Sequence, residues 1–327
     1  MKTDVVYAKT EEGAEVAVID VTSSAFAVSA TDAELAAMSE QYIREAGQQQ
    51  DLPAPIREAL RNSMLGRGLM AATGTFLDGM STYLLKLGPE NLGESATTID
   101  QRIAASFPAF AGRLRLQDVA RLLADGLASS AASRPRRPLC LVNIGGGPAS
   151  DSWNALIHLR AEQSDFVADC EIVIAVMDLD PRGPAFGVRA VDALCAPGGR
   201  LSGLNIGFRH FIYEWSDTNR LREVLAELRA CDAACGISSE GGLFEYGSDE
   251  EIVANLTALH GGTARDTVVV GSVTREGGPV RASLVASRFL TRPRTIEAFR
   301  GLAEQAGWTV QEVRERPFSY NVRLSKA

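Results

Sequence analysis

Apolar residues follow two different patterns along the chain, and the change comes near residue 130. After it, short apolar runs such as LCLVNI (139–144) alternate with segments whose apolar residues recur every three or four positions. Strands separated by helices of 10–15 residues predict a mainly parallel sheet covered on both faces. The last two runs lie only three residues apart, which predicts a terminal antiparallel β-hairpin. We expect strands at 139–144, 172–177, 204–213, 233–238, 267–273, 309–314 and 318–324, and helices at 151–162, 184–195, 219–229, 249–259 and 295–306.

Before residue 130 the pattern is mostly helical, with Gly88-Pro89 and Phe107-Pro108 as breaks between helices. The segment SSAASRPRRP (129–138) has the composition of a linker or an exposed turn. We therefore divide the chain into residues 1–135, a mostly helical cap that serves substrate binding or dimerisation, and residues 136–327, an α/β domain. In the first part we expect one short strand within 14–22 and helices at 31–46, 55–70, 75–86, 99–106 and 116–130.

Composition and charge narrow the function classes. The 327 residues carry 41 acidic and 33 basic side chains, a net charge of −8, which disfavours a nucleic-acid partner because such binding depends on a basic surface. No apolar run approaches the ~18 residues of a membrane-spanning helix, and the polar N-terminus does not read as a signal peptide. We expect a cytoplasmic protein that acts without a membrane.

The cysteines and histidines do not predict a metal site. Five cysteines are scattered, and the three histidines supply no paired ligand spacing of the kind that zinc sites use. We expect reduced thiols that fill apolar space and no bound metal.

A glycine-rich loop is the strongest local signal. The strand at 139–144 runs into Gly145, Gly146 and Gly147 and then into a helix. Glycines let a ligand approach the backbone, and free N–H groups at a helix start favour polar or anionic groups. A tight turn without a ligand is the alternative. A dinucleotide fingerprint fits less well, because the next acid, Asp178, comes 31 residues after Gly147 rather than about 20.

Polar and aromatic residues follow the next two strands. Asp178 and Leu179 come where the second strand ends, so the Asp178 carboxylate would lie at the carboxyl edge of the sheet, where open α/β sheets bind ligands. Its oxygens could accept hydrogen bonds from both hydroxyls of a ribose. Trp215 and Asp217 follow the third strand and could flank and hydrogen-bond an adenine; Asp217 could equally cap the following helix.

Four segments in this order resemble the class I S-adenosylmethionine-dependent methyltransferases: VNIGGGPAS, VMDLDP, GISSEGGLFEYGSDEEIVANL, and FRGLAEQAGWTVQEVRE with FSYNVRLSKA. The resemblance covers residues 136–327 and implies a Rossmann-like methyltransferase sheet with S-adenosylmethionine as cofactor. Two positions depart from the family pattern. Asn143 stands where the first motif usually has an acid, and Ala149 stands in place of its third glycine.

The resemblance also implies roles for individual residues. The glycine loop with Asn143 would bind the aminoacyl end of the cofactor, and Asp178 would bind its ribose. Ser239 and Glu240, after the fourth strand, would lie beside the sulfonium. Glu240 is also a candidate catalytic residue, or a structural acid. The remaining cofactor-binding residues implied are Gly145, Gly146, Gly147, Leu179, Trp215 and Asp217.

Two further groups have open interpretations. His210 lies within the third strand and is a catalytic candidate or a structural histidine. In the cap, Phe76, Met80 and Tyr83 recur at helical spacing and could form the wall of an acceptor site, a plain core stripe or part of a homodimer interface.

The leading hypothesis is methyl transfer from S-adenosylmethionine to oxygen, nitrogen or carbon of a small organic acceptor, with secondary metabolism as one setting for such a reaction. One alternative is an enzyme of the same fold that binds the cofactor but catalyses another reaction, such as a cyclisation. Another is a non-enzymatic interaction protein.

Overall fold

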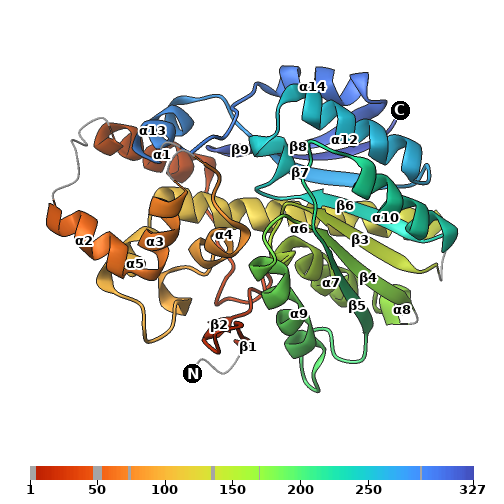
Figure 1. Cartoon of the computed structure of the whole chain (residues 1–327), viewed down its shortest axis with the longest axis horizontal. Coiled ribbons are helices and arrows are strands. Elements are labelled where there is room, and N and C mark those ends of the chain that lie inside the picture. The colour runs from red at the N-terminus through yellow and green to blue at the C-terminus, as the bar shows by residue number, and fades with distance from the viewer. Residues whose placement is uncertain (1–4, 47–53, 73–74, 134–136, 169, 288) are drawn as a thin grey trace.

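The computed structural model describes residues 5–46, 54–72, 75–133, 137–168, 170–287 and 289–327 (Figure 1). Its centre is a seven-stranded sheet in the order β5-β4-β3-β6-β7-β9-β8. Strands β3 to β7 pair in parallel, whereas β9 pairs antiparallel with both β7 and β8. The strands are β3 (Leu139–Ile144), β4 (Glu171–Met177), β5 (Asn205–Phe211), β6 (Ala234–Ser239), β7 (Val268–Thr274), β8 (Trp308–Glu315) and β9 (Ser319–Lys326).

Helices cover both faces of this sheet, which explains why its inner strands are apolar throughout rather than alternating. In β3, Leu139 and Leu141 belong to one hydrophobic cluster, and Cys140 and Val142 belong to another on the opposite face. The first cluster packs under α6 (Phe107–Ser133), α7 (Ser150–Glu162) and α9 (Arg182–Cys195). The second packs under α10 (Asn219–Ala230), α12 (Asp249–Gly262) and α14 (Ile296–Gln305). Three shorter helices complete this part: α8 (Ser164–Ala168), α11 (Leu243–Tyr246) and α13 (Gly278–Ser287).

The N-terminal region gathers beyond the carboxyl edge of the sheet, at the left of Figure 1. There α13, which comes from the C-terminal half of the chain, packs against α1. The elements of the region are β1 (Tyr7–Lys9), β2 (Glu15–Ala17), α1 (Asp32–Ala46), α2 (Ala54–Asn62), α3 (Met64–Ala71), α4 (Gly79–Leu85), the 3-10 helix η1 (Pro89–Asn91) and α5 (Thr98–Ala104).

The long helix α6 joins the two regions, since it begins among the cap helices and continues across one face of the sheet. Leu123 and Leu127 are fully buried and lie over Gly236 of β6, where an added Cβ would come within 2.8 Å of Leu123. Residues from both sides of position 135 therefore share one core.

The prediction of a mainly parallel sheet with a terminal hairpin and a helical N-terminal region is confirmed. Several details differ. The helix expected at 55–70 is two helices, because Ser63 caps α3 by accepting from the Gly66 N–H at 2.9 Å. Phe107-Pro108 does lie between two helices, but α6 begins at Phe107 rather than near 116, because proline in the first turn of a helix needs no N–H donor. The short helices α8, α11 and α13 were not expected.

Within the described ranges, no helix combines the length and the apolar composition that crossing a membrane requires.

Replacing Leu123 by alanine tests whether α6 is part of the sheet core. Because Leu123 is fully buried, Leu123→Ala should lower the free energy of unfolding by about 2–5 kcal/mol in urea titrations. Leu290→Ala is the matched control, since Leu290 is 59% exposed, and should change the free energy by less than about 0.5 kcal/mol. Equal effects of the two substitutions would contradict the packing described here.

Candidate functional site

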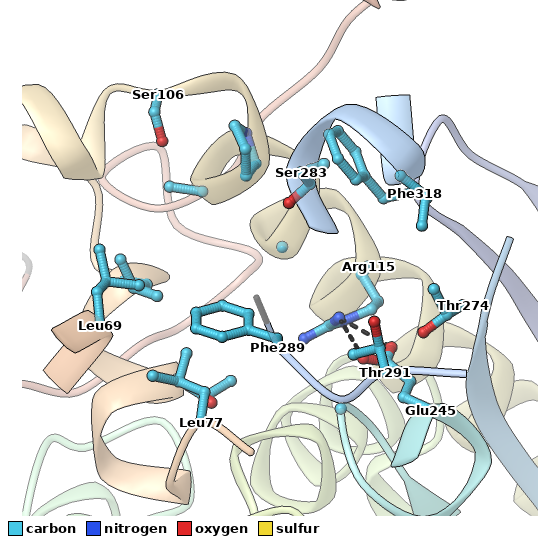
Figure 2. Close-up of a pocket in the computed structure, with 18 of the residues that line it drawn as sticks. Leu69, Leu77, Ser106, Arg115, Glu245, Thr274, Ser283, Phe289, Thr291 and Phe318 are labelled. Carbon is cyan, nitrogen blue, oxygen red and sulfur yellow. Dashed lines mark hydrogen bonds and ion pairs between the residues drawn. The ribbon is translucent and has the colours of Figure 1, made fainter. Parts of the chain in front are cut away.

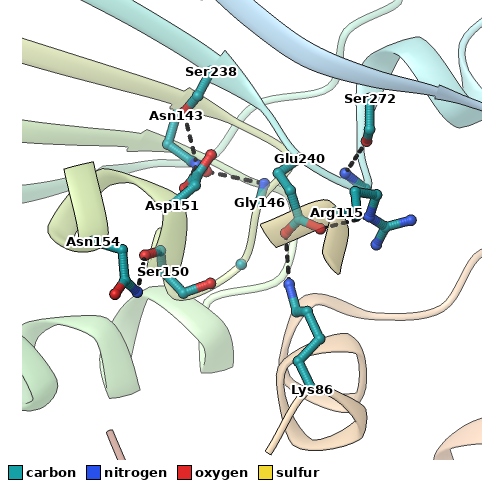
Figure 3. Close-up of polar contacts among 12 residues, drawn as sticks. Lys86, Arg115, Asn143, Gly146, Ser150, Asp151, Asn154, Ser238, Glu240 and Ser272 are labelled. Atoms are coloured by element: carbon teal, nitrogen blue, oxygen red, sulfur yellow. Dashed lines mark hydrogen bonds and ion pairs between the residues drawn. The ribbon is translucent and has the colours of Figure 1, made fainter. Parts of the chain in front are cut away.

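The glycine loop joins β3 to α7 at the carboxyl edge of the sheet. Gly145 and Gly147 adopt φ angles of +65° and +59°, a region that glycine enters at little cost. Asn143 lies beneath the loop, where its Oδ1 accepts from the Gly146 N–H at 3.0 Å and its Nδ2 donates to Asp151 Oδ1 at 2.8 Å (Figure 3). The amide that replaces the expected acid therefore supports the loop from the sheet side.

Asp178 lies directly beside this loop, because β4 pairs with β3. Its Oδ2 accepts from the Gly147 N–H at 2.9 Å and its Oδ1 accepts from the Asp180 N–H at 2.9 Å. Burial raises the pKa of Asp178 above its usual value. The sequence analysis thus placed the glycine loop and this carboxylate together, as the structure does. His210 of β5 lies behind them with Nε2 2.9 Å from the backbone oxygen of Asp178, an arrangement that supports the strand end.

Exposed apolar side chains follow the ends of β4 and β5 at this edge of the sheet. Leu179 and Ile212 follow β4 and β5 and are 50% and 59% exposed. The Trp215 ring lies against Gly145, where an added Cβ would come within 2.9 Å of it. Asp217 instead accepts from the Asn219 N–H at 2.9 Å at the start of α10. A carboxylate beside free apolar surface fits a ligand with hydroxyl groups and a flat ring, as in a nucleoside.

Helix α4 of the cap lies on the glycine loop. A Cβ on Gly79 would fall 2.4 Å from the Cα of Gly147, and a Cβ on Gly183 would fall 2.8 Å from the same atom. Only glycine allows backbones to approach this closely. A ligand that packs on Gly147 therefore has to displace α4.

Four largely buried charges connect the cap to the sheet edge: Lys86, Arg115 and Glu240 (Figure 3), and Glu245 (Figure 2). Lys86, just after α4, donates to Glu240 Oε2 at 2.5 Å, and Nε of Arg115 from α6 donates to Glu240 Oε1 at 2.6 Å. Nη1 of Arg115 also donates to Glu245 at 2.9 Å, and Ser272 donates to the same carboxylate. Lys86, Arg115, Glu240 and Glu245 are called the ion cluster below.

The ion cluster determines what Glu240 can do. Burial alone would raise the pKa of Glu240, but Lys86 and Arg115 outweigh it and lower the pKa to about 2. Such a carboxylate is a weak base, and both of its oxygens are occupied. The geometry therefore favours the structural role that the sequence analysis left open for Glu240. Ser239 is structural in the same sense, since its hydroxyl donates to the Ile144 carbonyl and accepts from the Leu243 N–H.

Asp151 carries a buried oxygen without a partner. Its Oδ1 accepts from Asn143 and from the Ser152 N–H, but Oδ2 has no hydrogen bond within the described residues although the side chain is only 1% exposed. Burial, with the nearby Glu240 charge adding to it, raises the pKa of Asp151 to about 6. An orphaned carboxylate oxygen of this kind can accept from a cationic group of a ligand.

A cavity of about 420 Å³ lies between the cap and the carboxyl edge of the sheet (Figure 2). Arg115, Glu245 and Gly241 line one end of it. Gly241 neighbours Gly242, whose backbone lies on Gly145, so the cavity begins close to the glycine loop.

The stripe expected to form an acceptor wall lies elsewhere. Tyr83 is fully buried, with its hydroxyl bonded to Ala17 and Ile19, and Met80 packs against the same core. Phe76 is 48% exposed and lies against Tyr246. The core interpretation therefore fits Tyr83 and Met80. The cavity is lined by Thr82 and Leu85 of α4 and by Lys86, just after that helix.

The sequence analysis missed Lys86 and Arg115 altogether and gave Asp151 no role. Lysine is rare in this chain, and a lysine within an apolar helical segment was a signal that could have been used. Arg115 had no such signal among the many arginines. Within the described ranges, no group of three or more histidine, cysteine or acidic side chains could hold a metal ion.

Comparison with known proteins bears on the fold. No protein-family model matches the chain, and no curated protein matches it. A possible exported protein from Bordetella parapertussis superposes with a TM-score of 0.56 and 20% identity over 91% of this chain and 97% of that one.

Two methyltransferase structures superpose less closely. For the mitomycin 7-O-methyltransferase MmcR the TM-score is 0.43 and the identity 14%, over 87% of this chain and 75% of that one. For the magnesium protoporphyrin IX methyltransferase ChlM from Synechocystis PCC 6803, with bound SAH, the values are 0.43 and 14%, over 68% and 89%. The strand order and the antiparallel hairpin give this chain the fold of class I methyltransferases.

Substitution of Asp151 tests its unpaired carboxylate. A folded-state pKa near 6, above the ordinary value of about 3.9, means that folding favours the protonated form. Asp151 therefore costs no stability below about pH 4, and the cost grows to about 3 kcal/mol as the pH rises past 6. Asp151→Asn should be more stable than the natural protein at pH 7 by about 2–3 kcal/mol, and this advantage should vanish at pH 4.

The measurement is urea unfolding between pH 4 and pH 7. Asp192→Asn, on the exposed side of α9, is the matched control and should change the free energy of unfolding at pH 7 by less than about 0.5 kcal/mol. A stability difference for Asp151→Asn that is independent of pH would refute the assignment.

Proposed function

We propose that this protein transfers a methyl group from S-adenosylmethionine to a small organic acceptor bound in the cavity. The observation that carries the proposal is the contact of the Asp178 carboxylate with Gly147 at the carboxyl edge of a sheet with this strand order, together with the cavity between the cap and that edge.

The residues present fit the cofactor. Asp178 would accept hydrogen bonds from its ribose, and Leu179 and Trp215 offer apolar surface for its adenine. The orphaned Oδ2 of Asp151 would accept from its ammonium group. Gly145 and Gly147 would allow the amino-acid end of the cofactor to approach the loop backbone closely once α4 has moved away from the loop. Bound there, the cofactor supplies an activated methyl group.

The chain itself would contribute alignment and exclusion of water rather than acid–base chemistry. Holding two reactants in line can supply most of the acceleration that a displacement reaction needs. The ion cluster fixes the cap over the sheet edge, and the apolar cavity walls keep bulk water from the acceptor. No proton transfer is assigned to Glu240 or His210, because both are engaged by neighbouring protein groups.

We further propose a cytoplasmic location. Cys140 and Cys235 are buried free thiols, which suits a reducing compartment. The cap helices could also pair two copies of the chain, and light scattering of the purified protein would show whether they do.

The function is tested with trideuteromethyl-labelled S-adenosylmethionine in an extract of small metabolites. Methyl transfer requires one labelled product for each molecule of S-adenosylhomocysteine formed. Retention of intact cofactor without consumption would favour a non-methylating reaction, and no binding of either cofactor form would favour an interaction protein.

The ribose assignment is tested by calorimetry with S-adenosylhomocysteine. Asp178→Ala should weaken binding by about 1–3 kcal/mol, because it removes charge-assisted hydrogen bonds. Asp180→Ala is the matched control, since that carboxylate is paired with Arg182 outside the crevice, and should leave affinity unchanged. An unaltered affinity of Asp178→Ala would mean that the ribose lies elsewhere.

The displacement of α4 is tested at Gly79. An added methyl group would fall 2.4 Å from Gly147 and so disfavour the arrangement with α4 on the loop. Since a larger fraction of the protein would then be open to the ligand, Gly79→Ala should bind S-adenosylhomocysteine several-fold more tightly. Gly301→Ala, in open space on α14, should not change the affinity. Weaker or unchanged binding by Gly79→Ala would show that α4 does not obstruct the site.

A further inference from the structure

The cavity under the cap has apolar walls and one polar end. Apolar side chains from widely separated segments form its walls, among them Leu69, Leu77, Ile103, Phe289 and Phe318. Its volume of about 420 Å³ lies in the range of small-molecule sites. A ligand that fills it therefore has an apolar body.

Arg115 is the permanent cation at the polar end. Burial alone would lower the pKa of Arg115, but Glu245 and Glu240 outweigh it and raise the pKa, so the guanidinium stays charged. Nε and Nη1 are bound to these two carboxylates, whereas Nη2 has no hydrogen bond within the described residues. Nη2 lies beside Gly241, which also lines the cavity, and Figure 2 shows the guanidinium between Glu245 and Phe289.

The ion cluster keeps this guanidinium in place without neutralising its free edge. Lys86 balances Glu240, and Arg115 balances Glu245, so the cluster as a whole carries no net charge. Because the side chain is held by two carboxylates, little rotamer freedom remains to be lost when a ligand binds. The free N–H groups of Nη2 can then bond only a group that accepts hydrogen bonds.

We propose that this cavity binds an apolar small molecule whose carbonyl or carboxylate oxygen accepts a hydrogen bond from Arg115 Nη2, and that it rejects amines. This inference deepens the proposed function, because it names the chemical class of the acceptor. That the bound molecule accepts a methyl group rests on the proposed function, whereas the ligand class of the cavity does not. Arg115 is thereby a specificity-determining residue. The hydroxyls of Thr274 and Thr291, which also line the cavity, offer further polar contacts at the same end.

The test uses three naphthalene probes and the protein without cofactor. Calorimetry measures the affinity of 2-naphthoate, of 2-naphthamide and of the cation 2-naphthylmethylammonium. At least one of the two oxygen-bearing probes should bind ten times more tightly than the cation. Whichever of 2-naphthoate and 2-naphthamide binds more tightly shows whether the ligand oxygen that accepts from Arg115 belongs to a carboxylate or to a neutral carbonyl. Equal or tighter binding of the cation, or no binding of any probe, would overturn the proposal.

A cavity-filling substitution locates the binding. Gly112 of α6 lines the cavity, and a Cβ there would meet Lys86 at an ordinary 3.6 Å, so Gly112→Leu should occupy the space without disturbing the fold. It should weaken binding of the preferred probe at least tenfold. Gly301→Leu, whose side chain would enter open space on α14, is the matched control and should bind as the natural protein does. Equal probe affinity in Gly112→Leu and the control would place the probe elsewhere and overturn the proposal.

A separate titration distinguishes this inference from the proposed function. Gly112→Leu should bind S-adenosylhomocysteine as the natural protein does, because Gly112 lies away from the glycine loop. If the probes behave as expected but S-adenosylhomocysteine does not bind to the natural protein, the proposed function fails and the ligand class of the cavity stands. If S-adenosylhomocysteine binds but the probes do not show the expected selectivity, the inference fails and the proposed function stands.

Discussion

The pairing of buried charges at the sheet edge constrains the whole site. Lys86 follows α4 of the cap and Arg115 belongs to the long helix α6. Both form ion pairs with Glu240, directly after β6. Removing one partner of a buried ion pair leaves an uncompensated charge, which costs several kcal/mol. The cap therefore cannot separate from the sheet edge at this point without exposing these groups to water. The cavity and the polar end of its lining both exist because this connection holds.

The contact of α4 with the glycine loop is of a different kind. Gly79 and Gly147 touch through backbone atoms, and the ion pair at this end of α4, between its N-cap Asp78 and Arg182, is long at 3.6 Å and largely exposed. The helix is thus anchored at its C-terminal end by the buried Lys86 and held at its N-terminal end by packing and this weak surface pair. A ligand on the loop has to displace only these contacts, so a local movement of α4 is compatible with an intact cap.

The sequence predicted the sheet well because its signals are local. The strands β3 and β4 are apolar runs bounded by polar residues or glycines, and β3 was predicted at its observed residues, Leu139–Ile144. The proximity of Asp178 to Gly147 also followed from local signals, since neighbouring parallel strands end at one edge. The ion cluster could not be predicted in this way. Glu240 pairs with residues 154 and 125 positions earlier, and nothing in a short window indicates such partners. The core position of Tyr83 could not be predicted either, because helical spacing shows which residues share one face of a helix but not what that face packs against.

A crystal structure grown with S-adenosylhomocysteine tests the central claim most directly. The account predicts the ribose against Asp178, the adenine between Leu179 and Trp215, the N-terminal end of α4 lifted from Gly147, and the Lys86–Glu240 pair intact. Crystals in which Gly79 still lies on Gly147 and the nucleoside is bound elsewhere, or is not bound at all, would contradict it.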